Sequence, residues 1–188
     1  MEALGIFTAF GLSASAGLNA YIPLLAVALL ARFTNLIHLK APWDGITSWW
    51  IIGLLIFLSA IEFVADKIPA VDHVNDVIMT FIRPAAGAIV FAASTSVIEM
   101  NTVFALAMGL LVAGSVHAVK ATARPVVTVS TGGTGNALMS LAEDTVSTAV
   151  SIVSIVWPYV AAFFVLLGFF LIILWLVRRS QKHKHEAA

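Results

Sequence analysis

The 188-residue sequence contains no cysteine. This absence excludes disulfide bonds, thiol catalysis and metal sites with cysteine ligands, although it does not fix the cellular compartment. Charged residues are also scarce: they make up 11% of the chain, whereas soluble domains carry about 25%. A soluble fold of this size would have too few charges to cover its surface with polar groups.

The sequence also has no excess of positive or negative charge. Ten basic and ten acidic residues give a net charge of zero, so no basic field points to nucleic acid. The start, Met1-Glu2-Ala3, lacks the positive charge of a secretory signal, and we expect the apolar stretch behind it to be a retained helix. The sequence has no HExxH, no GxSxG and no pair of CxxC motifs. We therefore expect that the protein is not an enzyme and that it has no cofactor and no metal site.

Apolar residues are abundant instead: they form 61% of the chain, and the mean hydropathy is +1.02. A helix needs about 20 apolar residues to cross the hydrocarbon core of a bilayer. Six stretches qualify, namely Leu4–Phe33, Ser48–Ala65, Val77–Thr95, Thr102–Ala121, Val126–Val150 and Ser151–Val177. The last two are continuous, and their junction is expected near Ser151 or at Trp157-Pro158. The sequence thus predicts an all-α integral membrane protein with about six transmembrane helices.

The polar segments between these stretches predict the topology. Residues 1–177 form one transmembrane domain, and residues 178–188 form a basic tail that we place in the cytoplasm because Lys and Arg mark that side. Six crossings would also place the N-terminus in the cytoplasm and the segment 36–47 outside. Segments 66–76 and 120–136 are expected to be cytoplasmic loops or re-entrant segments.

An internal repeat is suggested by three weak matches that keep the same order. GLSASAGLNA at 11–20 aligns with GLLVAGSVHA at 109–118, which places Asn19 opposite His117. LSAIE at 58–62 aligns with MSLAE at 139–143, which places Glu62 opposite Glu143. A third match pairs Pro84 with Pro158. We expect an inverted repeat of two three-helix units, about 1–97 and 98–177, with broken or re-entrant segments; the alternative is chance similarity between apolar strings.

Four acidic residues are expected to bind a proton or cation, because a charge inside a bilayer is costly and usually faces a cavity or a partner. They are Glu62, Asp66, Glu143 and Asp144. The alternative is that each lies at a helix end and meets headgroups or a lysine. Nearby polar residues would line the same path, namely Asn19, Ser59, Ser140 and His117.

A second set of residues could hold an anion. Arg83, Lys120 and Arg124 supply positive charge, and Gly132 and Gly133 belong to the segment STGGTGN, which is expected to be non-helical. Arg83 precedes a proline inside a predicted span, and an ion pair with Asp76, Asp72 or Glu62 is the competing interpretation.

Three segments carry a resemblance to a known family. They are GLSASAGLNAYIPLL at 11–25, EFVADKIPAVDHVND at 62–76 and RPVVTVSTGGTGNALMSLAED at 124–144. They resemble a bacterial membrane family catalogued as domain of unknown function 4126, over nearly the whole chain to about residue 177. The resemblance implies a small multi-span inner-membrane protein and supplies no substrate.

Three functions are compatible with these patterns. The first is a small secondary transporter or exchanger for an ion or small molecule, coupled to a proton or cation through the intramembrane carboxylates. The second is a translocase for an anionic lipid such as a polyprenyl phosphate. The third is a non-transporting subunit or scaffold of a membrane complex. We expect membrane lipid as a partner, and a homodimer is compatible with the small size.

Overall fold

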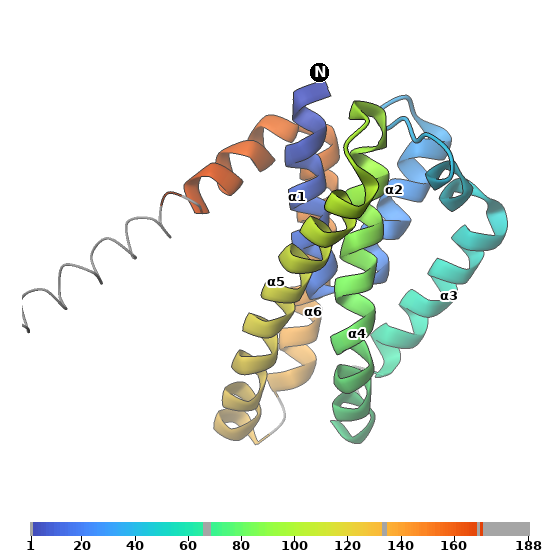
Figure 1. Cartoon of the computed structure of the whole chain (residues 1–188). Helices are drawn as coiled ribbons and strands as arrows, with labels where there is room; N and C mark the ends of the chain where they lie inside the picture. Colours follow the sequence, from blue (N-terminus) through green and yellow to red (C-terminus); the bar gives the residue numbers. More distant parts are fainter. Residues whose placement is uncertain (1, 66–68, 133–134, 169, 171–188) are drawn as a thin grey trace, which may run out of the picture.

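The computed structural model describes residues 2–65, 69–132, 135–168 and 170, and this part of the chain is helical, without strands (Figure 1). The long helices are α1 (Glu2–Leu18), α2 (Tyr21–Phe33), α3 (Trp49–Ala65), α4 (Pro69–Ser94), α5 (Thr102–Thr131) and α6 (Gly135–Val156). Two short 3₁₀ helices, η1 (Trp43–Thr47) and η2 (Ser96–Ile98), lie in the connections, and a further helix covers Pro158–Gly168.

Helix α1 lies at the centre of the bundle and packs against α2, α4, α5 and α6. Small residues let these backbones approach: a Cβ on Gly17 would lie 2.5 Å from the Ala113 carbonyl oxygen of α5. Serine hydroxyls join α1 to its neighbours. Ser13 donates to the Gly87 carbonyl of α4 at 2.9 Å, and Ser15 bonds Ser147 of α6. These hydroxyls satisfy polar groups that would otherwise be unpaired in an apolar interior.

The first predicted span, Leu4–Phe33, is not one helix. It breaks at Asn19 and Ala20 into α1 and α2. The end of α1 lies beside the middle of α5, because Leu18 contacts Lys120, and α2 then returns toward the end from which α1 came (Figure 1). Together α1 and α2 form a helical hairpin within the bundle.

The break corrects the predicted topology. Gly5, near the start of α1, lies against Ser94 at the end of α4, and the backbone amide of Lys40 bonds Ser96 nearby. The N-terminal helix and the segment 36–47 therefore share one end of the bundle, whereas six simple crossings would separate them.

Two predicted loops are mostly helical. Helix α4 begins at Pro69, so most of the segment 66–76 belongs to it, and residues 66–68 lie outside the described part. Helix α5 continues through Pro125 to Thr131 and α6 begins at Gly135, so most of the segment 120–136 is helical; residues 133–134 lie outside the described part. Gly132 ends α5 with a φ of +59°, a left-handed conformation that glycine adopts without strain. The junction after α6 falls at Trp157-Pro158, one of the two expected positions.

The two predicted repeat units differ where they can be compared. The first unit breaks after Asn19, whereas α5 continues without interruption through the matching His117. The described helices therefore do not reproduce the sequence alignment of the first and fourth predicted spans.

Three helical segments are long and apolar enough to cross a bilayer: Val74–Ser94, Thr102–Thr131 and Gly135–Val156. Large apolar side chains also cover the outside of the bundle. Trp50 and Phe57 of α3 are 89% and 62% exposed, and Phe81 of α4 is 76% exposed. An apolar surface of this extent is typical of a protein that contacts lipid.

A glycine substitution tests the close contact of α4 with α5. A Cβ on Gly109 would lie 2.3 Å from the Gly87 carbonyl oxygen, whereas a Cβ on Gly53 of α3 would meet open space. We expect Gly109→Val to lower the free energy of unfolding by about 1–3 kcal/mol through overpacking. Gly53→Val, the matched control, should change it little. Chemical unfolding in detergent micelles measures both, and equal effects would contradict the packing.

Candidate functional site

The break between α1 and α2 is stabilised by Asn19. Its Oδ1 accepts hydrogen bonds from the backbone amides of Tyr21 and Ile22 at 3.0 and 3.1 Å, which satisfies the first amides of α2. Its Nδ2 donates to Asp144 of α6 at 2.9 Å. Pro23 follows in the first turn of α2, where a proline is tolerated. One buried side chain thus starts a helix and ties it to α6.

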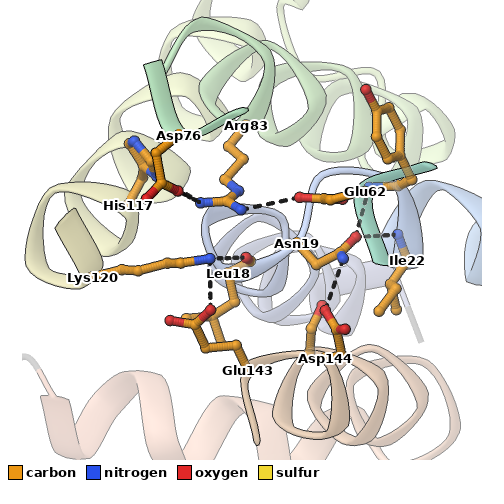
Figure 2. Close-up of polar contacts among 12 residues, drawn as sticks. Leu18, Asn19, Ile22, Glu62, Asp76, Arg83, His117, Lys120, Glu143 and Asp144 are labelled. Carbon is orange, nitrogen blue, oxygen red and sulfur yellow. Dashed lines mark hydrogen bonds and ion pairs between the residues drawn. The ribbon is translucent and has the colours of Figure 1, made fainter. Parts of the chain in front are cut away.

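The other end of the break binds a lysine. Lys120 of α5 donates to the Leu18 carbonyl at 3.1 Å and pairs with Glu143 of α6 at 2.7 Å (Figure 2). The Lys120 and Glu143 side chains are 2% and 9% exposed. The last carbonyls of a helix lack partners and carry partial negative charge. The ammonium group therefore lies between a helix C-terminus and a carboxylate.

A second buried ion pair joins α3 to α4. Arg83 Nη2 lies 3.0 Å from Glu62 Oε1, and both side chains are 1% exposed. Arg83 Nη1 also donates to His117 Nδ1 at 3.2 Å. Because arginine has no acceptor, this contact requires an unprotonated Nδ1. Thr80 donates its proton to the Asp76 carbonyl, so Nε2 of His117 donates to the Thr80 hydroxyl at 3.1 Å. The geometry describes a neutral histidine whose two ring nitrogens are both hydrogen-bonded.

A third acid, Asp76 of α4, bridges two arginines. Its Oδ1 lies 2.5 Å from Arg124 Nη1 and 3.8 Å from Arg83 Nη1. The Asp76 side chain is 26% exposed, more than the side chains of Glu62 and Glu143. Figure 2 shows Asp76, Arg83 and Glu62 in one row, with Lys120 and Glu143 below it.

A cavity of about 400 Å³ adjoins this cluster. Its polar lining comes from α4, α5 and α6, and the remaining wall is apolar. The lining residues are Asp76, Val77, Thr80, His117, Ala121, Arg124, Pro125, Thr128, Val129 and Asn136. All of these lining residues come from α4, α5 and α6. The charged cluster contacts the break between α1 and α2 through Lys120, and it contributes Asp76 and Arg124 to the cavity wall.

An exposed ion pair outside the spans gives a contrast. Lys40 Nζ lies 2.9 Å from Glu99 Oε1, with side chains 50% and 81% exposed. The hydrogen bond and the positive charge of Lys40 lower the pKa of the Glu99 carboxyl below its ordinary value. Water solvates both partners, so this pair contributes far less to stability than a buried one.

The structure brings together most of the predicted site residues. Glu62, Glu143, Asp144, Asn19 and His117 of the predicted cation path lie in one cluster with Arg83, Lys120 and Arg124 of the predicted anion set. The two sets form a single site because the acids pair with the bases. The expected pairing of Arg83 with Glu62 and Asp76 is confirmed.

Other predicted residues lie elsewhere. Ser140 is buried on α6, whereas Ser59 is half-buried on α3 and makes no hydrogen bond through its hydroxyl. Gly132 ends α5 and does not line the cavity. Asp66 and Gly133 lie outside the described residues.

Sequence reasoning missed the cavity residues Thr80, Thr128 and Asn136, and it treated Asp76 only as a partner for Arg83. Asp76 and Asn136 had been assigned to loops. The spacing of these residues could have revealed the shared face. Asp76 and Thr80 are four residues apart and Thr80 and Arg83 are three apart, so all three lie on one side of a helix.

The buried pair on α5 and α6 predicts a stability pattern. Lys120→Met leaves Glu143 as a buried unpaired carboxylate, so we expect a loss of about 3–5 kcal/mol in the free energy of unfolding. The double variant Lys120→Met/Glu143→Gln should recover most of this loss, because neither charge remains. Lys40→Met is the matched control and should change little. Unfolding in detergent micelles measures all three, and a double variant no better than the single one would contradict the pairing.

Comparisons with known proteins give one match. The family described as "Domain of unknown function (DUF4126)" matches residues 6–179. No curated protein matches the chain, and neither does any solved structure. The family match agrees with the resemblance seen in the sequence.

Proposed function

The chain belongs to this family of unknown function, and we propose that it is a small proton-coupled secondary transporter of the bacterial inner membrane. The buried network of acids and bases at the break between α1 and α2 carries the coupling. The observation that supports the proposal most directly is Lys120, held between the Leu18 carbonyl and Glu143.

This arrangement favours a proton over a metal cation as the coupling ion. In transporters with broken helices, carbonyls at a half-helix C-terminus coordinate cations such as Na⁺. Here a lysine ammonium has that position, and a buried lysine can lose and regain a proton. Glu143, Glu62 and the neutral His117 belong to the same buried network of ion pairs and hydrogen bonds.

The position of the charged cluster supports alternating access. The cluster contacts the break between α1 and α2 through Lys120, and it adjoins the cavity through Asp76 and Arg124. A substrate in this cavity would contact Arg124 and Asp76, which are connected to Glu62 through Arg83. A change in protonation would then alter the contacts available to the substrate.

The orientation of the protein in the membrane follows from the rule that Lys and Arg mark the cytoplasmic side. We place the basic tail, 178–188, in the cytoplasm together with the turn after α5. If the segment from Pro158 crosses the membrane, the N-terminus lies outside, opposite to the side expected from six simple crossings. We retain the inverted repeat and the homodimer as parts of the proposal; their support is the sequence alignment and the small size of the chain.

Translocation of an anionic lipid is the second candidate. Its support is the cavity, where Arg124 and His117 lie beside Val77 and Val129, which are 65% and 85% exposed. A lipid phosphate would contact the basic groups while its chain remained near the exposed apolar side chains.

A flux experiment tests the leading candidate. The protein is reconstituted in proteoliposomes, a pH gradient is imposed, and an internal dye reports proton movement with each member of a panel of small ions and organic solutes. We expect proton flux with wild type and its loss in the neutral double variant Lys120→Met/Glu143→Gln, which removes both charged groups of the pair without leaving an unpaired charge.

The matched control is Lys40→Met/Glu99→Gln, which removes the exposed pair and should retain wild-type flux. Equal flux from both double variants would refute a role for Lys120. Absence of flux from folded wild type with every solute, combined with scrambling of a fluorescent anionic lipid, would favour the lipid translocase.

A further inference from the structure

We propose that the cavity binds an uncharged organic molecule through its hydrogen-bond donors, and that two prolines create the acceptors for it. This inference rests on the proposed function and deepens it, because it names the class of substrate. The juxtaposition that carries it lies on two adjacent helices. Pro84 of α4 and Pro125 of α5 release the backbone carbonyls of Thr80 and Ala121, and both of these residues line the one cavity.

Each proline removes one hydrogen bond from its helix. A proline has no backbone N–H, so the carbonyl four residues earlier loses its helical partner. For Pro84 this carbonyl belongs to Thr80, and for Pro125 it belongs to Ala121. Within the described part of the chain, no side chain donates a hydrogen bond to either carbonyl. Both carbonyls can therefore accept a hydrogen bond from a bound molecule.

A third proline shows how the same kind of carbonyl is satisfied elsewhere in the bundle. Pro158, at the junction after α6, removes the amide that would pair with the Ser154 carbonyl. Thr8 of α1 donates its hydroxyl proton to this carbonyl at 2.9 Å. Such hydroxyls commonly satisfy carbonyls that a proline releases inside the membrane. The two carbonyls at the cavity have no comparable hydroxyl among the described residues, which points to a partner from outside the chain.

Asp76 adds a third acceptor one helical turn before Thr80. Its Oδ1 contacts Arg124 and Arg83, whereas its Oδ2 takes part in no ion pair or hydrogen bond among the residues that the structure describes. The side chain is 26% exposed and lines the cavity. Two carbonyl oxygens and one carboxylate oxygen thus require donors from a ligand, such as a hydroxyl or an amide N–H group.

The charges at the cavity disfavour an ionic ligand. An anion would be repelled by the Asp76 carboxylate and by the negative ends of the two carbonyl dipoles. A cation would meet Arg124 and Arg83, whose Nη1 atoms lie 2.5 and 3.8 Å from Asp76 Oδ1. Both arginines already contact a carboxylate. An uncharged molecule adds no charge for this buried network to compensate.

The rest of the wall defines the body of the ligand. Val77, Val129 and the ring of Pro125 give it apolar surface. The volume of about 400 Å³ falls within the range of small-molecule sites, about 300–1,000 Å³. The site therefore fits an organic molecule that has a small apolar body and a hydroxyl or amide group directed at the acceptors.

Saturation-transfer NMR of the full chain in nanodiscs tests the ligand class, with empty nanodiscs as the reference for partitioning into lipid. Four probes share one phenyl ring. Benzamide is uncharged and donates through its amide, acetophenone is uncharged and has no donor, benzoate is an anion, and benzylammonium is a cation. Benzamide should bind at least about 10-fold more tightly than each of the others, because acetophenone loses two hydrogen bonds and the ions add a charge.

Two variants test the carbonyls, because alanine restores the amide that pairs with each of them. Pro84→Ala and Pro125→Ala should each bind benzamide about 2- to 10-fold more weakly than wild type, the effect of one neutral hydrogen bond. Their affinity for acetophenone should not change. Pro158→Ala is the matched control, because it restores the amide partner of Ser154, which does not line the cavity, and it should bind benzamide as wild type does. Alanine favours a helix, so all three variants should fold.

Three results would overturn the proposal. Folded wild type that does not bind benzamide would refute the site. Acetophenone or either ion binding as tightly as benzamide would refute the ligand class, and this comparison needs no variant. Equal benzamide affinity in Pro84→Ala, Pro125→Ala and Pro158→Ala would refute the role of the released carbonyls.

A lipid arm identifies the source of the donor. Dioleoylglycerol, whose headgroup is an uncharged hydroxyl, is added to the nanodisc bilayer. We expect unchanged benzamide binding, as for a free solute, whereas displacement would assign the same donor chemistry to a membrane lipid. Binding is measured without a gradient, so its failure differs from failure of transport. Benzamide binding without proton flux would refute only the transport function, and proton flux without benzamide binding would refute only this site.

Discussion

Neutralising charge inside an apolar bundle is the constraint on which the rest of the structure depends. An unpaired ion in a low-dielectric interior costs several kcal/mol, and a pair remains only when its hydrogen bonds are also satisfied. Here Arg83, Lys120 and Arg124 are each at most 5% exposed, and each contacts a carboxylate. The helices must pack so that these groups meet. The break after Leu18 also helps to stabilise a buried charge, because it leaves the Leu18 carbonyl available to accept a hydrogen bond from Lys120.

The cost of intramembrane charge made much of the site predictable from the sequence. Glu62, Glu143 and Arg83 stood out because they interrupt apolar stretches, and all three are buried in ion pairs. Their partners were harder to assign, because sequence spacing does not say which helices become neighbours. The acids and the bases were therefore treated as two competing sites, whereas packing places them in one.

The predictions from the sequence that were wrong concern where helices begin and end. The segment Leu4–Phe33 has no charge at the break, and Pro23 lies three residues beyond it, so the long apolar run favours one helix. Contacts of Asn19 with Asp144 and with the amides of α2 decide otherwise. Conversely, Pro125 did not stop α5, because a helix packed against neighbours can tolerate a proline that would break an isolated one. These misplaced boundaries assigned Asp76 and Asn136 to loops and hid the cavity.

Each of the two most buried ion pairs joins helices that are consecutive in the chain: Glu62 of α3 pairs with Arg83 of α4, and Lys120 of α5 pairs with Glu143 of α6. This order matters while the protein is being made. A single helix carrying one such charge would enter the bilayer at a cost of roughly 2.5–3.5 kcal/mol. In a hairpin of α3 and α4, or of α5 and α6, each member of the buried pair meets its opposite charge. Both pairs can therefore form within two consecutive helices, before contacts with the rest of the bundle are made.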